Sequence, residues 1–242
     1  MILTALIIIH LIADFYFQST NCAQKKVKEF KYFVIHIVLY TLVTIVGLLL
    51  IVEPKRIIKP ALFLSIIHLI IDFIKIRINK IKSSSSFHFL TFVIDQLLHV
   101  FSILFVFYSF RLREFPSVIA IRLVDFFTVD VCRTWLRYGL LFILLLDPAS
   151  VFVKLLSACA SNETNLIEQK GDASVGQIIG KLERIIIAVL VLCNQIGTIG
   201  FVLTAKSLAR YKQLENREFA EKYLVGTLSS ITIAIVATLL LK

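Results

Sequence analysis

The chain has 242 residues, 58% of them hydrophobic, and a mean hydropathy of +0.89. Soluble domains are about 45–50% apolar, so the composition excludes an ordinary soluble protein, and apolar runs near the ~20 residues that cross a bilayer indicate a polytopic helical membrane protein. Because no soluble basic domain is present, we assign the excess of 26 Lys and Arg over 16 Asp and Glu to membrane topology, not to nucleic-acid binding.

Seven apolar segments are predicted to cross the membrane as helices. They are residues 2–18, 32–52, 59–78, 88–110, 138–158, 177–204 and 222–241. A further stretch, 116–136, mixes charges with aromatic residues and predicts an interfacial amphipathic helix. We therefore expect an all-α transmembrane bundle in three parts: residues 1–110 with four spans, an interfacial segment at 111–137, and a three-span part at 138–242.

The basic loops predict an orientation for the first half of the chain. Lysines crowd the loop at 25–31, and Arg77, Lys80 and Lys82 follow the third span, so both loops should be cytoplasmic and the N-terminus outside. Simple alternation would then leave the basic 206–222 loop outside. Either the stretch at 116–136 hides another crossing, or the span at 177–204 is irregular.

Three of the predicted spans carry a His and an Asp four residues apart. The pairs are His10 with Asp14, His68 with Asp72 and, in reversed order, Asp95 with His99. Residues four apart share one face of a helix, and reversing the order on an antiparallel helix restores matching heights. The aspartates should thus form one layer near the cytoplasm and the histidines a second layer one turn deeper, which His36 also enters.

This set of side chains predicts a metal or proton site. Ionisable groups in lipid are costly and usually mark function, and imidazole with carboxylate suits Zn²⁺, Mn²⁺ or Fe²⁺. The histidines can ligate one metal while the aspartates orient them, or both layers can bind in a two-metal site. The alternative is that the pairs are hydrogen bonds that hold the helices together.

Lysine and glutamine side chains flank these pairs. Lys75 lies one turn from Asp72, where it can bind an anionic substrate group or extend to the membrane surface as a topology marker. Gln18 and Gln96 are the other polar neighbours. For catalysis we expect Asp14 or Asp95 to act as general base and Lys75 or Arg184 to stabilise an anion.

The C-terminal half has a second group of charges. Gly176 and Gly180 form a GxxxG pattern, typical of close helix packing, and are a candidate homo-oligomer face. Adjacent Glu183 and Arg184 predict an ion-pair lock between the last two spans or a basic pocket for a lipid headgroup. Their candidate partners are Lys206, Arg210 and Glu221. Asn194 and Gln195 suggest polar contacts or an irregular helix.

Several motifs together resemble the bacterial membrane family catalogued as Domain of Unknown Function 3307. They are HLIADFYFQ, a Lys-rich loop with His36 followed by Tyr40, HLIIDFIK, DQLLH, IGKLERIII, GFVLTAKSLAR and EKYLVGTLSS. The resemblance implies that the protein lies in the bacterial inner membrane and shares the motifs of this family. It implies no activity. A weaker likeness, of pattern only, is to YdjM-type membrane-bound metal-dependent hydrolases, which raises the expectation of hydrolysis by analogy.

The leading functional prediction is a membrane-embedded hydrolase that depends on a divalent metal, opens to the cytoplasmic leaflet and acts on a membrane lipid or lipid-linked phosphoester. One alternative is a cation or proton transporter that uses the same side chains as a transit site. Another is a structural or partner-binding protein in which metal or ion pairs hold the bundle together.

Overall fold

The computed structural model describes residues 1–18, 25–27, 29–81, 84–161 and 172–242. Within these ranges every regular element is a helix, and the β-type pairing is limited to an isolated bridge between Val52 and Pro116. The all-α prediction is therefore confirmed. The chain divides into two compact units, one of residues 1–82 and 90–143 and the other of residues 83–89 and 144–242.

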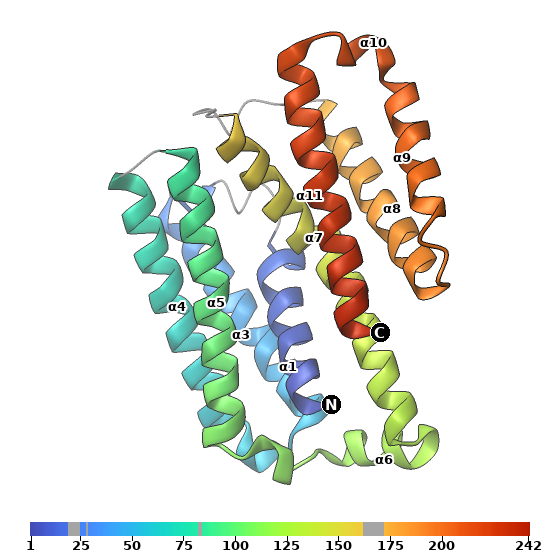
Figure 1. Ribbon diagram of the computed structural model, residues 1–242. Helices are drawn as coiled ribbons and strands as arrows, with labels where there is room; N and C mark the ends of the chain where they lie inside the picture. Colours follow the sequence, from blue (N-terminus) through green and yellow to red (C-terminus); the bar gives the residue numbers. More distant parts are fainter. Residues whose placement is uncertain (19–24, 28, 82–83, 162–171) are drawn as a thin grey trace. The chain divides into compact units, whose positions relative to one another are not determined.

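The first unit holds the helices of the N-terminal half (Figure 1). Its elements are α1 (Ile2–Leu11), the π-helical turn η1 (Ile12–Tyr16), α3 (Phe30–Ile51), the 3-10 turn η2 (Pro54–Arg56), α4 (Ile58–Ile81), most of α5 (Ser85–Ser109), the 3-10 turn η3 (Leu112–Glu114), α6 (Val118–Phe127) and the start of α7 (Val129–Ala160). The second unit holds the rest of α7 with α8 (Asp172–Leu192), α9 (Thr198–Ala209), α10 (Tyr211–Leu214) and α11 (Arg217–Leu241).

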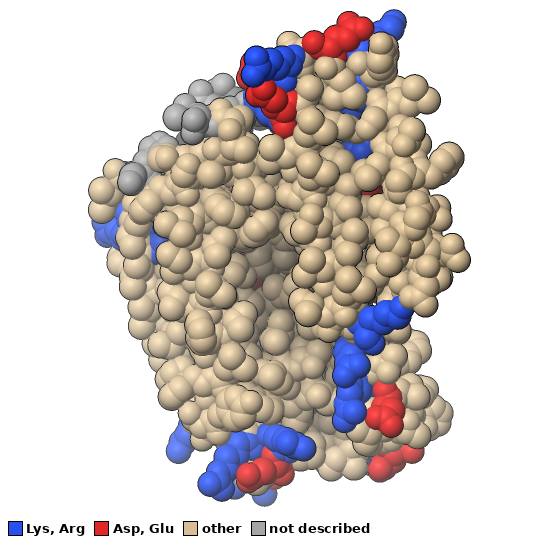
Figure 2. Space-filling view, viewed as in Figure 1, with Lys and Arg blue, Asp and Glu red and all other residues tan. Residues whose placement is uncertain are grey.

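Four helices in the described ranges, α3, α5, α7 and α11, are long and apolar enough to cross a membrane. Large apolar side chains are exposed along them, for example Leu42 (59%) on α3 and Phe101 (64%) on α5. Figure 2 shows that most of the visible face is formed by residues other than Lys, Arg, Asp and Glu. A surface of this kind is stable in lipid and not in water, so the chain is a helical membrane protein.

The remaining predicted spans are helical but shorter or more charged. α4 is long enough, yet carries Asp72, Lys75 and Arg77 among its apolar residues. The first predicted span ends at Tyr16 and has a π-helical last turn. The predicted span at 138–158 lies within α7, which already begins at Val129. Residues 129–136 therefore belong to the long helix α7. Helix α6 ends at Phe127, and Thr128 (φ 71°) separates the two helices.

The predicted continuous span at 177–204 is wrong. α8 ends at Leu192 and α9 begins at Thr198. Between them Asn194 adopts a left-handed backbone (φ 58°), which an Asn tolerates better than most residues. Figure 1 shows α8 and α9 as an antiparallel hairpin. With 12 residues, α9 is about 18 Å long, which is too short for the ~30 Å hydrocarbon core of a bilayer. The predicted alternative, an irregular helix, is the one observed.

An apolar cluster closes one end of the first unit. Leu6, Leu64 and Ile103 each lie four residues from His10, His68 and His99 along their helices, and all are at most 3% exposed. Leu48 of α3 completes this layer. Close packing of α1 on α3 depends on Gly47, because a Cβ there would lie 2.6 Å from Ile9 Cδ1. The apolar layer thus fixes the four helices directly beside the histidines.

Candidate metal centre

The His and Asp side chains of the three predicted pairs, together with His36, meet in the first unit. They come from α1, η1, α3, α4 and α5, and each is at most 8% exposed. They are His10, Asp14, His36, His68, Asp72, Asp95 and His99. Burial of so many ionisable groups is costly unless they neutralise one another or bind a ligand.

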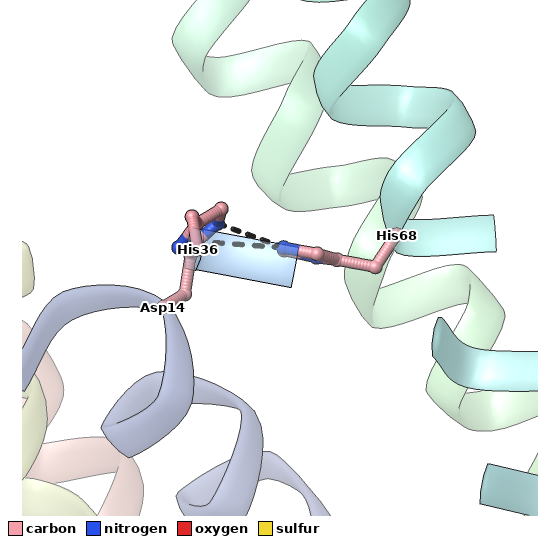
Figure 3. Close-up of side chains that lie close together, drawn as sticks. All are labelled: Asp14, His36 and His68. Atoms are coloured by element: carbon pink, nitrogen blue, oxygen red, sulfur yellow. Dashed lines mark hydrogen bonds and ion pairs between the residues drawn. The ribbon is translucent and has the colours of Figure 1, made fainter. Parts of the chain in front are cut away.

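Four atoms of this cluster form a compact set. His36 Nε2 lies 3.1 Å from His68 Nε2, 3.2 Å from Asp72 Oδ2 and 3.5 Å from Asp14 Oδ1. His68 Nε2 lies 4.0 Å from each of the two carboxylate oxygens. In a tetrahedral zinc site two ligand atoms stand about 3.3 Å apart, since each is ~2.0–2.1 Å from the metal. Asp14, His36 and His68 are therefore spaced so that they could hold one cation, with Asp72 Oδ2 beside His36, and Figure 3 shows the first three side chains converging.

The π-helical turn places Asp14 in this set. The Phe17 amide donates to the Ile12 carbonyl, five residues back, which widens the turn. Tyr16 anchors the turn through a 2.7 Å hydrogen bond to the Ile143 carbonyl. The sequence predicted an α-helical pair with His10 and Asp14 on one face. The structure places Asp14 Oδ1 3.5 Å from His36 Nε2 and 4.0 Å from His68 Nε2.

A second group lies beside the first. Ligand atoms of His68, Asp72 and His99 all fall within 4.8 Å of one another, as do those of Asp14, His36 and His68. His99 Nε2 is 3.6 Å from Asp95 Oδ1. Neither atom, nor His10 Nε2, has a hydrogen-bond partner among the described residues. A buried polar atom without a hydrogen-bond partner lowers the free energy of unfolding by about 1–3 kcal/mol. These three atoms are therefore candidates to bind a ligand.

Two lysines neutralise part of the negative charge. Lys26 Nζ is 3.0 Å from Asp72 Oδ2, and Lys75 Nζ is 2.6 Å from Asp95 Oδ2. Asp14 has no lysine partner in the described part of the chain and accepts a hydrogen bond from Gln96 Nε2 at 3.1 Å. Three buried carboxylates thus face two lysines. One formal negative charge is left, which a divalent cation would offset.

Lys75 has a partner that the sequence interpretations did not name. Its ammonium pairs with Asp95, and its side chain is 24% exposed; the roles in anion binding and topology stay predictions. Lys26 was missed as a member of the cluster, because a Lys-rich loop is usually a topology signal. Nothing in the sequence distinguishes Lys26 from Lys25 or Lys31 in that loop.

Tyr40 is the other residue that the functional prediction missed. Its ring stacks on His68 with centroids 3.6 Å apart and planes within 2°, and its hydroxyl is 3.3 Å from His10 Nδ1. It therefore orients two imidazoles at once. A signal existed, because Tyr40 follows His36 by four residues and so shares its helix face.

The second unit contains the predicted charges of the C-terminal half. Glu183 pairs with Lys206 at 2.6 Å, within the α8–α9 hairpin and not between the last two predicted spans. Glu221 pairs instead with Arg217 at 2.9 Å, and Arg210 lies half-buried where α9 meets α10. The predicted lock thus exists in part, but it closes a hairpin whose existence the sequence left open.

Arg184 has no carboxylate partner within the described residues. Its guanidinium, 2% exposed, donates to the carbonyls of Leu145 and Leu146 and to the hydroxyls of Ser150 and Ser230. Leu145, Leu146 and Ser150 flank Pro148 in α7, and Ser230 lies on α11. A proline inside a helix removes a backbone hydrogen bond and exposes carbonyls, so Arg184 satisfies a weakened stretch of helix. Since four acceptors already occupy its donors, the arrangement does not favour the predicted headgroup pocket.

The glycines predicted as an oligomer face differ from each other. A Cβ on Gly176 would meet nothing within 4 Å, whereas one on Gly180 would lie 3.5 Å from Arg184 Nη1. A Cβ on Gly180 would therefore make an ordinary van der Waals contact with the arginine of its own helix. Gly176 is exposed, and the homo-oligomer face stays a prediction.

The family model described as "Protein of unknown function (DUF3307)" matches residues 2–126. That range contains the entire His/Asp cluster together with Lys26, Tyr40 and Lys75. No curated protein and no solved structure matches the chain.

Proposed function

The chain belongs to the family described as Protein of unknown function (DUF3307), and because this description assigns no activity, we propose from the site itself that the protein is a membrane-embedded hydrolase dependent on a divalent metal. The observation that carries the proposal is the set of four buried ligand atoms on His36, His68, Asp14 and Asp72. Two imidazole nitrogens and two carboxylate oxygens suit Zn²⁺, Mn²⁺ or Fe²⁺.

A cation held by these residues would polarise an ester and lower the pKa of a bound water. Hydrolysis would join the oxygen of a water to the phosphorus or acyl carbon of the substrate and would break the bond to the leaving oxygen. Asp95 or Asp14 would accept one proton of that water and return it to the leaving oxygen. Asp95 retains one oxygen, Oδ1, without a hydrogen-bond partner among the described residues.

The layers of the first unit support access from one side. Lysine and glutamine side chains flank the aspartates, and the apolar layer of Leu6, Leu48, Leu64 and Ile103 closes the bundle beyond the histidines. The basic loops next to the aspartates suggest that the open side faces the cytoplasm. A substrate there is a lipid or lipid-linked phosphoester whose scissile bond lies near headgroup depth.

The α8–α9 hairpin supports a specific topology in the bacterial inner membrane. If α8 and α9 enter and leave on the same side, six of the seven predicted spans cross and the N-terminus is outside. The basic stretch at 206–222 then lies in the cytoplasm with the loops at 25–31 and 77–82. The amphipathic α6 lies at the outer surface, with Phe126 79% exposed.

The test is metal content measured together with hydrolysis. Purified full-length protein should carry stoichiometric metal and should release product from a panel of phospholipids and lipid-linked phosphates. His68→Gln should abolish both, while Ser102→Ala, one turn from His99 and outside the ligand set, should retain both. The proposal would be wrong if the purified protein carried no metal and the His68→Gln variant hydrolysed the substrate as fast as the wild type. Metal without activity on the whole panel would favour the structural role.

A transport function has one observation in its favour. The hydroxyls of Thr44 and Ser65 are buried without hydrogen-bond partners in the described part of the chain. Both lie about one helical turn from the stacked rings of Tyr40 and His68. They extend the row of buried polar side chains toward the apolar layer that closes the bundle. Zn²⁺ or Mn²⁺ flux into proteoliposomes, abolished by Thr44→Val with Ser65→Ala, would support transport. A hydrolase should show no such flux.

A further inference from the structure

Three buried ligand atoms lie beside the proposed cation and are not used by it. They are His99 Nε2, Asp95 Oδ1 and His10 Nε2, on side chains that are 1%, 2% and 3% exposed. His99 Nε2 and Asp95 Oδ1 are 3.6 Å apart, which is too far for a good hydrogen bond but close to the spacing of two ligands on one metal, about 3.3 Å. The His10 and His99 rings lie 4.9 Å apart between centroids.

We propose that the group of His68, Asp72 and His99, with Asp95 Oδ1 3.6 Å from His99 Nε2, holds a second divalent cation, so that the centre is binuclear; this inference rests on the proposed function. Asp72 is the group that joins the two positions. Its Oδ2 is 3.2 Å from His36 Nε2 in the first set, and its carboxylate also lies within 4.8 Å of ligand atoms of His68 and His99. A carboxylate with two oxygens can bind one cation through each, as in sites whose metals stand ~3.5–4 Å apart.

A hydrogen-bond network alone does not account for these atoms. Lys75 and Gln96 both engage Asp95 Oδ2 and leave Oδ1 unpaired. Tyr40 engages His10 Nδ1 and leaves Nε2 unpaired. In each case the contact orients the side chain through one atom while the other atom stays available, which is how metal ligands are commonly positioned.

The charge of a binuclear centre defines the class of substrate. The three carboxylates and the two lysines leave one formal negative charge, and two divalent cations turn it into an excess of three positive charges. In a buried site such an excess requires an anion. A phosphate monoester or diester meets this requirement, whereas a neutral carboxylic ester does not. Asp95 is then a ligand of the second cation, as Asp14 is of the first.

The experiment is a titration of the metal-free full-length protein with Mn²⁺ in detergent, followed by metal analysis and electron paramagnetic resonance. The wild type should bind two Mn²⁺ per chain and show the spectrum of an exchange-coupled pair. Asp95→Asn with His99→Gln should bind one Mn²⁺ and show the six-line spectrum of an isolated ion. Ser102→Ala is the matched control on α5 and should behave as the wild type.

Each outcome decides a different point. One isolated Mn²⁺ per wild-type chain would overturn the binuclear centre and leave the proposed function standing. No bound Mn²⁺, with none of the other divalent metals bound either, would overturn both. Two coupled ions in the double variant would overturn the assignment to Asp95 and His99. The wild-type spectrum does not depend on the variant, so the inference remains testable even if the double variant fails to fold.

Discussion

The two units bury polar clusters of opposite character. In the first, ring nitrogens of His10 and His99 and an oxygen of Asp95 are buried without partners among the described residues. In the second, Arg184 is just as buried, yet it donates to two carbonyls and two hydroxyls. Buried atoms without hydrogen-bond partners indicate a binding site, whereas an arginine with four hydrogen bonds to its own unit indicates a structural contact. Burial of charge in a membrane helix is thus by itself no sign of a binding site.

The largest effect should come from a substitution in the first cluster. His68→Ala removes a central ligand, and metal affinity should fall on the order of 1,000-fold, about 4 kcal/mol. Isothermal titration with Zn²⁺ or Mn²⁺ measures this loss. The matched change in the second unit, Arg184→Leu, should leave affinity unchanged. Equal affinity in the wild type and in His68→Ala would contradict the ligand role.

Arg184→Leu should instead destabilise the second unit by about 3 kcal/mol, because it leaves buried carbonyls and hydroxyls next to Pro148 without donors. Unfolding in mixed micelles, followed by circular dichroism, measures the change. Arg184→Lys should recover part of the loss. If the Leu variant is as stable as the wild type but loses binding of a phosphate headgroup, Arg184 belongs to a ligand site and the contrast between the units fails.

Tyr40→Phe tests orientation in the first cluster. The ring still stacks on His68, but the contact of the hydroxyl with His10 Nδ1 is lost. Loss of an outer partner of a metal ligand typically costs 10–100-fold, and because the stack remains we expect about tenfold weaker Mn²⁺ binding, with little change in stability. A stability loss without any change in affinity would show that Tyr40 only packs.

The smallest effect is expected from the Glu183–Lys206 ion pair, whose side chains are 15% and 18% exposed. A double-mutant cycle with Glu183→Gln and Lys206→Met should give a coupling energy of about 1 kcal/mol, because a partly exposed pair is screened. Thermal unfolding of the four proteins provides the values. A coupling energy near zero would mean that the pair does not close the α8–α9 hairpin.

Much of the first cluster could be predicted from local spacing. A helix has a period of 3.6 residues, so the His and Asp of α4 and of α5 had to share a face, and the reversed order on α5 had to restore their heights. The same argument predicted helices whose bounds agree with α3, α4, α5 and α11 to within a few residues. The sequence showed no sign of the π-helical turn that follows His10 and carries Asp14, although both side chains are buried as the other members of the cluster are.

The sequence by itself determined the membrane class, the all-α fold and the side chains available for a metal centre, since these follow from composition and from contacts between near neighbours in the chain. Only the tertiary structure decided which atoms meet. Lys26, from a run of lysines, pairs with Asp72, and Tyr40 contacts both His10 and His68. The predicted helix is interrupted at Asn194, and Arg184 donates to carbonyls next to Pro148. Each of these depends on residues distant in sequence, whose approach is set by packing and not by local periodicity.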